Sequence, residues 1–179
     1  MRRVYMGAFV FALSIALSPS VARAQCTAAG SGGTCNLPGS VSMTAGRVVR
    51  LQVSAGSTSL TAPTPTDFDA GLNATTGPAL TISANAGWTL HLRSSTALWS
   101  ATNTSPGAPA RTNKPAADLR WSTAAGGPFV PLTTTDANLV TGAATASTAT
   151  TLYFQTLYSW TLDTPGDYSL TLVLTLTSP

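Results

Sequence analysis

The sequence contains no glutamate and a single lysine, Lys114, and charged residues make up only 8% of its 179 residues. Surface helices draw heavily on Glu, Lys, Gln and Leu, so this shortage excludes a predominantly helical domain. Threonine, by contrast, occurs 30 times, and its branched side chain suits the pleated surface of a strand. The composition therefore predicts an all-β fold.

Histidine is equally scarce, because His91 is the only one. One histidine cannot build a zinc site that needs several imidazole ligands, and no G-x-S-x-G motif accompanies it for nucleophilic catalysis. We interpret His91 as an exposed residue on the outer face of a strand. The protein is therefore expected not to be an enzyme and to need no cofactor or metal.

Long hydrophobic runs are also rare, and the one that stands out covers residues 4–17, directly after Met1-Arg2-Arg3. Its length of about 14 residues falls short of the roughly 20 that a membrane-spanning helix needs. The small residues of Ala22-Arg23-Ala24 then match a signal-peptidase site. Residues 1–24 are thus predicted to be a signal peptide. The mature chain would have no membrane span and would be exported to the periplasm, the cell surface or the extracellular medium.

Net charge disappears once the signal peptide is removed. Residues 1–24 carry three of the nine basic residues, which leaves six basic and six acidic residues. The six cations are scattered, whereas a nucleic-acid footprint needs a clustered basic patch, so nucleic acid is excluded as a partner. A weakly charged surface tolerates self-association, which favours a second copy or another cell-surface protein as the partner.

The only cysteines are Cys26 and Cys35. An exported chain reaches an oxidising compartment, where such a pair normally forms a disulfide. The bond would close an N-terminal loop over residues 25–39 and stabilise the fold by about 2–3 kcal/mol. The spacing differs from the C-x-x-C of thiol oxidoreductases, so redox catalysis is not expected.

Alternating apolar residues mark the strands of a single domain over residues 40–179. The clearest runs are 152–162 and 168–176, and the turn residues between them predict an antiparallel pair. Further strands are expected at 41–43, 49–53, 80–84, 88–92, 97–100, 119–122 and 129–132, with a hairpin turn at Asn85 and Gly87. About seven to nine short antiparallel strands favour a β-sandwich, with a closed barrel as the alternative.

Two segments lack an apolar period and are predicted as loops. Residues 102–117 contain several prolines and asparagines, and residues 133–151 are rich in Thr and Ala without an aromatic residue. Long loops in compact domains are either variable surface inserts or binding loops. We favour the surface insert for both.

Two pairs of charged residues are candidate sites. Asp67 and Asp69 would share one face of an extended segment, where they could bind Ca²⁺, act as a glycosidase pair, or simply be solvated. Solvated carboxylates at a strand edge are the favoured interpretation. Asp118 and Arg120 share a strand face in the same way and are expected to form a surface salt bridge beside Trp121.

The four tryptophans divide into two groups. Trp88 and Trp160 are in phase with aliphatic neighbours, which predicts that both lie in the core. Trp99 and Trp121 flank the loop at 102–117 and are candidates for an exposed aromatic platform. Such a platform would stack on a sugar ring, so a glycan is a candidate ligand.

The segment Thr164-Pro165-Gly166-Asp167-Tyr168-Ser169-Leu170-Thr171-Leu172 resembles the P-G-x-Y-x-L-x-L final strand of many bacterial exported immunoglobulin-like sandwiches, including fimbrial and spore-coat-U-like subunits. Its Gly166 and Tyr168 resemble a tyrosine corner, in which the hydroxyl bonds back to nearby backbone. The resemblance implies an antiparallel immunoglobulin-like β-sandwich with a surface or appendage role. Chaperone-assembled pilins donate an apolar N-terminal strand, whereas this N-terminus is a polar loop, so a self-complete domain is expected.

These features lead to two functional hypotheses. The first is an exported, non-enzymatic β-sandwich with a structural or cell-surface role, including a fimbrial or appendage-like one. The alternative is a glycan-binding or adhesion module that uses exposed aromatic residues and the loop at 102–117.

Overall fold

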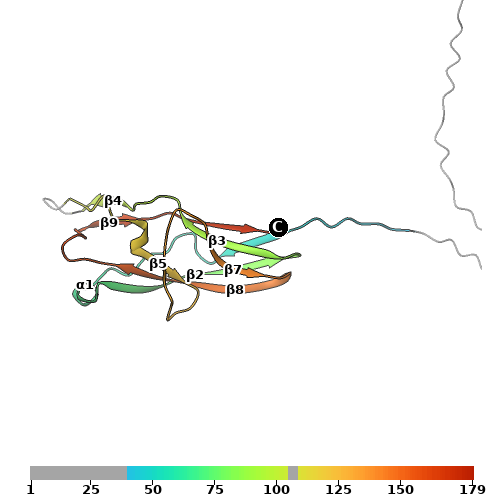
Figure 1. The fold of residues 1–179 in the computed structure, drawn as a ribbon, viewed down its shortest axis with the longest axis horizontal. Coiled ribbons are helices and arrows are strands. Elements are labelled where there is room, and N and C mark those ends of the chain that lie inside the picture. The colour runs from blue at the N-terminus through green and yellow to red at the C-terminus, as the bar shows by residue number, and fades with distance from the viewer. Residues whose placement is uncertain (1–39, 105–108) are drawn as a thin grey trace, which may run out of the picture. The chain divides into compact units, whose positions relative to one another are not determined.

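Ten strands, one short α-helix and one 3-10 turn make up the part of the chain that the computed structural model describes, residues 40–104 and 109–179 (Figure 1). The elements are β1 Val49–Val53, α1 Pro65–Ala70, β2 Leu72–Ala84, β3 Trp88–Ser94, β4 Ser100–Asn103, η1 Ala116–Asp118, β5 Leu119–Ser122, β6 Val130–Pro131, β7 Ala137–Gly142, β8 Thr145–Leu157, β9 Gly166–Ser169 and β10 Leu172–Thr177. All of these elements belong to one compact unit, Ala45–Pro179. The predicted signal peptide and the predicted Cys26–Cys35 disulfide lie outside the described residues.

The strands form three sheets, and every pairing between them is antiparallel, which confirms the predicted all-β class. The largest sheet has the order β1-β2-β8-β5-β6. A second sheet has the order β10-β3-β7, and β4 pairs with β9 in a third. The edge strands β1 and β10 therefore belong to different sheets.

One hydrophobic cluster joins the two larger sheets. It includes Leu80 and Ile82 of β2, Leu90 and Leu92 of β3, and Leu152 and Phe154 of β8. Each of these side chains is at most 2% exposed, and burying one is worth about 1.5–3 kcal/mol. The alternation along β3 follows the two-residue period of a strand, so the sequence pattern there identified the buried face correctly.

Four of the predicted strands, 49–53, 80–84, 88–92 and 119–122, fall within β1, β2, β3 and β5. The predicted hairpin at Asn85 is wrong, because β2 and β3 belong to different sheets and the turn carries the chain from one to the other. Asn85 holds this turn, since its Oδ1 accepts from Val48 N at 2.7 Å and its Nδ2 donates to Gly46 O at 2.8 Å.

The C-terminal prediction of one continuous strand is also wrong. β9 pairs with β4, whereas β10 pairs with β3, and the chain changes sheets at Leu170 and Thr171. Ser95 N donates to Thr171 O at 2.9 Å and holds the crossing. The predicted pairing with residues 152–162 does not form either, because β8 lies between β2 and β5 and ends at Leu157.

Residues 133–151, predicted as a loop, form β7 and the first half of β8. Thr suits this half-exposed strand surface although the segment has no apolar period, and Leu139 is the only buried residue in it. The short strands expected at 97–100 and 129–132 are displaced or shortened to β4 and β6. Residues 41–43 form no strand, and Val41 and Met43 are exposed.

Candidate functional site

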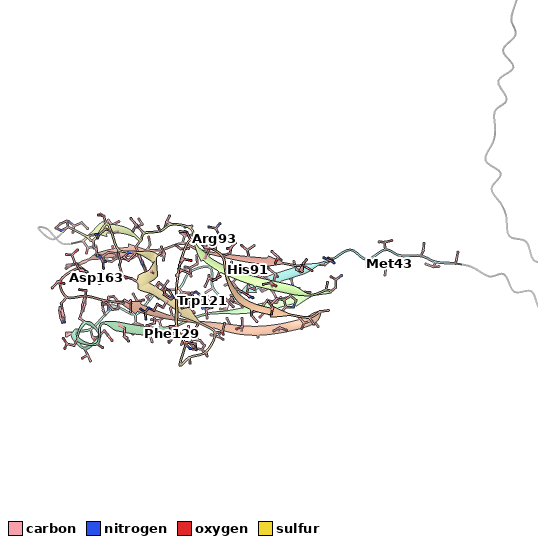
Figure 2. All side chains as sticks on the ribbon, in the orientation of Figure 1. Met43, His91, Arg93, Trp121, Phe129 and Asp163 are labelled. Atoms are coloured by element: carbon pink, nitrogen blue, oxygen red, sulfur yellow. The ribbon has the colours of Figure 1, made fainter. Side chains whose placement is uncertain are left out.

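Several long-range contacts meet at the end of the domain where α1 lies, and Figure 2 places Asp163 at that end. The contributing segments are α1, the turn after β8 at residues 158–163, the segment 109–118, and the start of β9. They come from distant parts of the sequence, so folding alone brings their side chains together.

A buried ion cluster occupies the centre of this region. Lys114 Nζ lies 2.9 Å from Asp163 Oδ1 and 3.2 Å from Asp118 Oδ2. Arg111 Nη1 makes the same two contacts, at 2.9 Å to Asp163 and 3.2 Å to Asp118. The Lys114 ammonium also donates to Leu157 O at 2.9 Å, which accounts for all three of its protons. Two cations and two anions balance in the cluster, so it has no net charge.

The environment of Asp163 determines its ionisation. Burial favours the protonated carboxyl, but hydrogen bonds from Lys114 and Arg111, together with the charge of Lys114, outweigh it and lower the pKa of Asp163 below the ordinary 3.8. Asp163 Oδ2 also accepts from Ser159 N at 2.8 Å. The ionised carboxylate therefore holds the turn after β8, a strand that ends at Leu157 and not at residue 162 as the sequence pattern predicts.

Tyr168 connects this cluster to the last strands. Its hydroxyl donates to Thr164 O at 2.7 Å, four residues upstream, and accepts from Arg111 N at 3.0 Å. The first contact is the one that a tyrosine corner makes. Gly166 is required beside it, because a Cβ there would lie 2.8 Å from Thr102 O and 2.9 Å from Ala110 Cβ.

An aromatic cluster lies on the outer side of the same end. The rings of Phe68 and Trp160 stack with centroids 4.6 Å apart, and Phe68 also contacts Tyr158 at 5.4 Å. Trp160 Nε1 donates to Asp69 Oδ1 at 3.0 Å. The prediction that Trp160 lies in the core is wrong, because its side chain is 60% exposed.

The extended segment expected around Asp67 and Asp69 is instead the helix α1. Thr64 and Asp67 form a capping box at its start, and Thr64 hydrogen bonds lower the pKa of Asp67. Gly71 ends the helix with φ of 73°, a left-handed conformation that favours glycine. The two carboxylates thus serve separate purposes, one as a helix cap and the other as the acceptor for Trp160.

The exposed platform expected at Trp99 and Trp121 is not present, because these side chains are only 6% and 7% exposed. Trp99 Nε1 donates to Pro115 O at 3.1 Å, and Trp99 N donates to Lys114 O at 2.9 Å. These bonds hold residues 114–115, which belong to the predicted loop, against the core. The tryptophans flanking the loop are therefore packing residues.

The salt bridge expected between Asp118 and Arg120 is also wrong. Asp118 pairs with Arg111 and Lys114, whereas Arg120 Nε is buried on β5 without a hydrogen-bond partner in the described structure. His91 is half-buried rather than exposed, and its Nδ1 is likewise unpartnered there. Within residues 40–104 and 109–179, no three metal-ligating side chains gather at one point. No described helix has the length and apolarity to cross a membrane.

Two hollows accompany these features. One, of about 630 Å³, lies beside Trp160 and is lined by Phe68, Tyr158 and Trp160 together with polar groups that include Thr61, Asp163 and Thr164. The other, of about 570 Å³, runs between Val53 and Leu172 and reaches Leu152 and Phe154 of the core. Both volumes lie in the range of small-ligand sites.

Comparisons with known proteins do not assign the chain to a family. No model of a protein family matches the chain, and no curated protein matches it either. The fold and the site therefore define the protein only as an antiparallel all-β domain with a buried ion cluster and an exposed aromatic cluster at one end.

Sequence reasoning missed Arg111, Lys114 and Asp163 as a group. One signal was available, because Lys114 is the only lysine and stands four residues before Asp118. In a chain with so few charges, a single lysine is expected to form a specific ion pair within the fold rather than to serve solubility. The distant partner, Asp163, carried no comparable signal.

Proposed function

We propose that this protein is an exported, non-enzymatic β-sandwich of the immunoglobulin type that serves as a structural subunit of a cell-surface assembly. Two sheets that share one core and the Tyr168 hydrogen bond to Thr164 support this fold type. The balance of six acidic and six basic residues after position 24 supports self-association.

The groove between the two larger sheets is the observation that carries the assembly role. Its walls include Val53 of β1 and Leu172 of β10, which are the edge strands of their sheets, and its floor reaches Phe154. An edge strand beside an apolar groove is the kind of surface that accepts a further strand from another chain. This groove also argues against the self-complete domain expected from the sequence.

A segment of suitable chemistry precedes β1. Val41 and Met43 are 100% and 88% exposed, and residues two apart would point to the same side once this segment pairs as a strand. We take the occupant of the groove to be the segment around these residues from a second copy of the chain. Each copy would then cover the groove of the next.

Light scattering of residues 25–179 over a concentration series tests this proposal. The parent should grow in molar mass with concentration, whereas the pair Val41→Asp and Met43→Asp should stay monomeric because a charged segment does not enter an apolar groove. Val53→Lys should have the same effect from the groove side. Val130→Lys is the matched control, since Val130 is 44% exposed on β6 and Val53 is 41% exposed.

A parent that stays monomeric across the series would contradict the proposal, as would equal growth of all four proteins. The alternative function, a glycan-binding module centred on Trp99 and Trp121, loses its platform because both rings are buried.

A further inference from the structure

Trp160 differs from the other three tryptophans in its exposure. Trp88, Trp99 and Trp121 are 3%, 6% and 7% exposed, whereas Trp160 is 60% exposed. An indole in water costs free energy that burial would recover, so an exposed tryptophan that is held in one position is a candidate contact surface.

The Trp160 ring is held from two directions. Its face stacks on Phe68 with an interplanar angle of 28°, and its Nε1 donates to Asp69 Oδ1 at 3.0 Å. Both supporting residues belong to α1, so one short helix sets the orientation of the indole. A ring that is already fixed loses little freedom when a ligand binds to it.

The supports of this ring are fixed in turn. The capping box of Thr64 and Asp67 holds the start of α1, and Tyr158 N donates to Gly71 O at 2.9 Å at its end. Asp163 closes the turn that carries Trp160, because its Oδ2 accepts from Ser159 N. Hydrogen bonds therefore fix both α1, which supports the Trp160 ring, and the turn that carries Trp160.

The hollow of about 630 Å³ beside Trp160 combines an aromatic wall with hydrogen-bonding groups. Its aromatic residues are Phe68, Trp99, Tyr158, Trp160 and Tyr168, and its polar residues include Thr61 and Asp167. A pyranose ring has a matching chemistry, since its C–H face packs on an aromatic ring while its rim of hydroxyls donates to oxygen acceptors.

The charges at the hollow favour an uncharged ligand. Lys114 and Asp163 also line it, but they belong to the balanced cluster with Arg111 and Asp118. The Lys114 protons are already used within the protein, so no cation is left there to attract an acidic sugar. An additional carboxylate, Asp167, would repel an anion.

We infer that this hollow binds a neutral oligosaccharide, with one sugar ring stacked on Trp160. The inference does not rest on the assembly role. The two hollows share Leu60, Trp99 and Tyr168, but Phe68 and Trp160 line only the hollow beside α1. It also places the aromatic platform at residues other than those indicated by the sequence.

Affinity electrophoresis of residues 25–179 tests the inference, in gels that contain dextran, mannan, xylan, laminarin or the acidic polysaccharide alginate. At least one neutral polysaccharide should retard the parent, and Trp160→Ala should weaken the apparent affinity by about tenfold or more, as truncation of a central tryptophan contact does. Trp160→Phe should restore part of the retardation. Leu162→Ala is the matched control, since Leu162 is 54% exposed in the same turn but does not line the hollow.

Fluorescence supplies a second readout that needs no variant. Trp160 is the exposed one of four tryptophans, so acrylamide should quench mainly its emission. An oligosaccharide of the retarding type should reduce that quenching. Far-UV circular dichroism of Trp160→Ala checks that the variant is folded.

The inference would be overturned if no neutral polysaccharide retards the protein, whether or not alginate does, or if the parent and Trp160→Ala are retarded equally. A change in molar mass of Trp160→Ala by light scattering, without any glycan effect, would also overturn it and assign Trp160 to a contact between copies.

Discussion

Lys114 Nζ and Asp163 Oδ1 lie 2.9 Å apart between two side chains that are 3% and 7% exposed. The pair joins the segment before η1 to the turn after β8, 49 residues further along the chain. Removing one partner of a buried ion pair is far more costly than breaking a surface pair, because the other charge stays buried. The stability of the segment before η1 and that of the turn after β8 are therefore coupled by this contact.

Replacing Lys114 should destabilise the protein strongly. Lys114→Met leaves two carboxylates with only Arg111 as their cation, and we expect a loss of about 3–5 kcal/mol in the free energy of unfolding. Urea titration followed by circular dichroism measures it. Arg93→Met breaks the exposed Arg93–Asp136 pair and should cost less than about 1 kcal/mol. Similar losses in the two variants would show that the cluster does not stabilise the fold.

Acid should lower the free energy of unfolding because it protonates Asp163. The pKa of Asp163 is lower in the folded state than its ordinary 3.8, so its stabilisation is present above about pH 4 and is lost as the pH falls through the folded-state pKa. Unfolding curves measured from pH 7 down to pH 2 should show this decline. The difference in stability between the parent and Asp163→Asn should narrow below about pH 4. Asp136→Asn, which removes an exposed carboxylate 3.4 Å from Arg93 Nε, is the control for the loss of a surface charge.

The Tyr168 hydroxyl should contribute measurably to stability. Tyr168→Phe removes the bond to Thr164 O and leaves Arg111 N without its acceptor, and we expect a loss of about 1–3 kcal/mol. Thermal unfolding compares this variant with Tyr153→Phe on β8 as the control. A Tyr168→Phe protein as stable as the parent would mean that water replaces both bonds.

A methyl group at Gly77 should disturb the core. A Cβ there would lie 2.5 Å from Phe154 Cε2 and 3.1 Å from Leu152 O, so Gly77→Ala forces a buried ring to move. We expect a loss of about 1–3 kcal/mol, as for other overpacked sites. Gly56→Ala is the matched control, because no atom lies within 4 Å of its added Cβ. Chemical denaturation should show a clearly lower free energy of unfolding for Gly77→Ala than for Gly56→Ala.

The sequence predicted best where a strand buries one face completely. The run from Trp88 to Leu92 alternates with period two, and the structure buries the same residues. Prediction failed where a strand is half-exposed on both faces, as in the Thr- and Ala-rich start of β8. It also failed at residues 168–176, because an alternating pattern carries no information on which sheet each half of the run joins.

The candidate site was harder to predict than the fold. The pattern placed Trp160 in the core because Leu152 and Phe154 precede it in phase, yet β8 ends at Leu157, before that position. Ion pairs such as Lys114 with Asp163 depend on tertiary contacts that spacing cannot reveal. Local motifs fared better, because the Tyr168 contact to Thr164 spans only four residues.

The change of sheets at Leu170 and Thr171 has a consequence for the order of folding. β10 is the last strand in the described chain and pairs with β3, whose residues lie 78 to 88 positions earlier (172 − 94 and 177 − 89). A chain that emerges N-terminus first therefore exposes the β10 side of β3 until residues 172–177 have emerged. Such long-range pairing is slow, because distant segments must meet before their contacts stabilise them. The nascent domain would thus need protection from aggregation until its last strand docks.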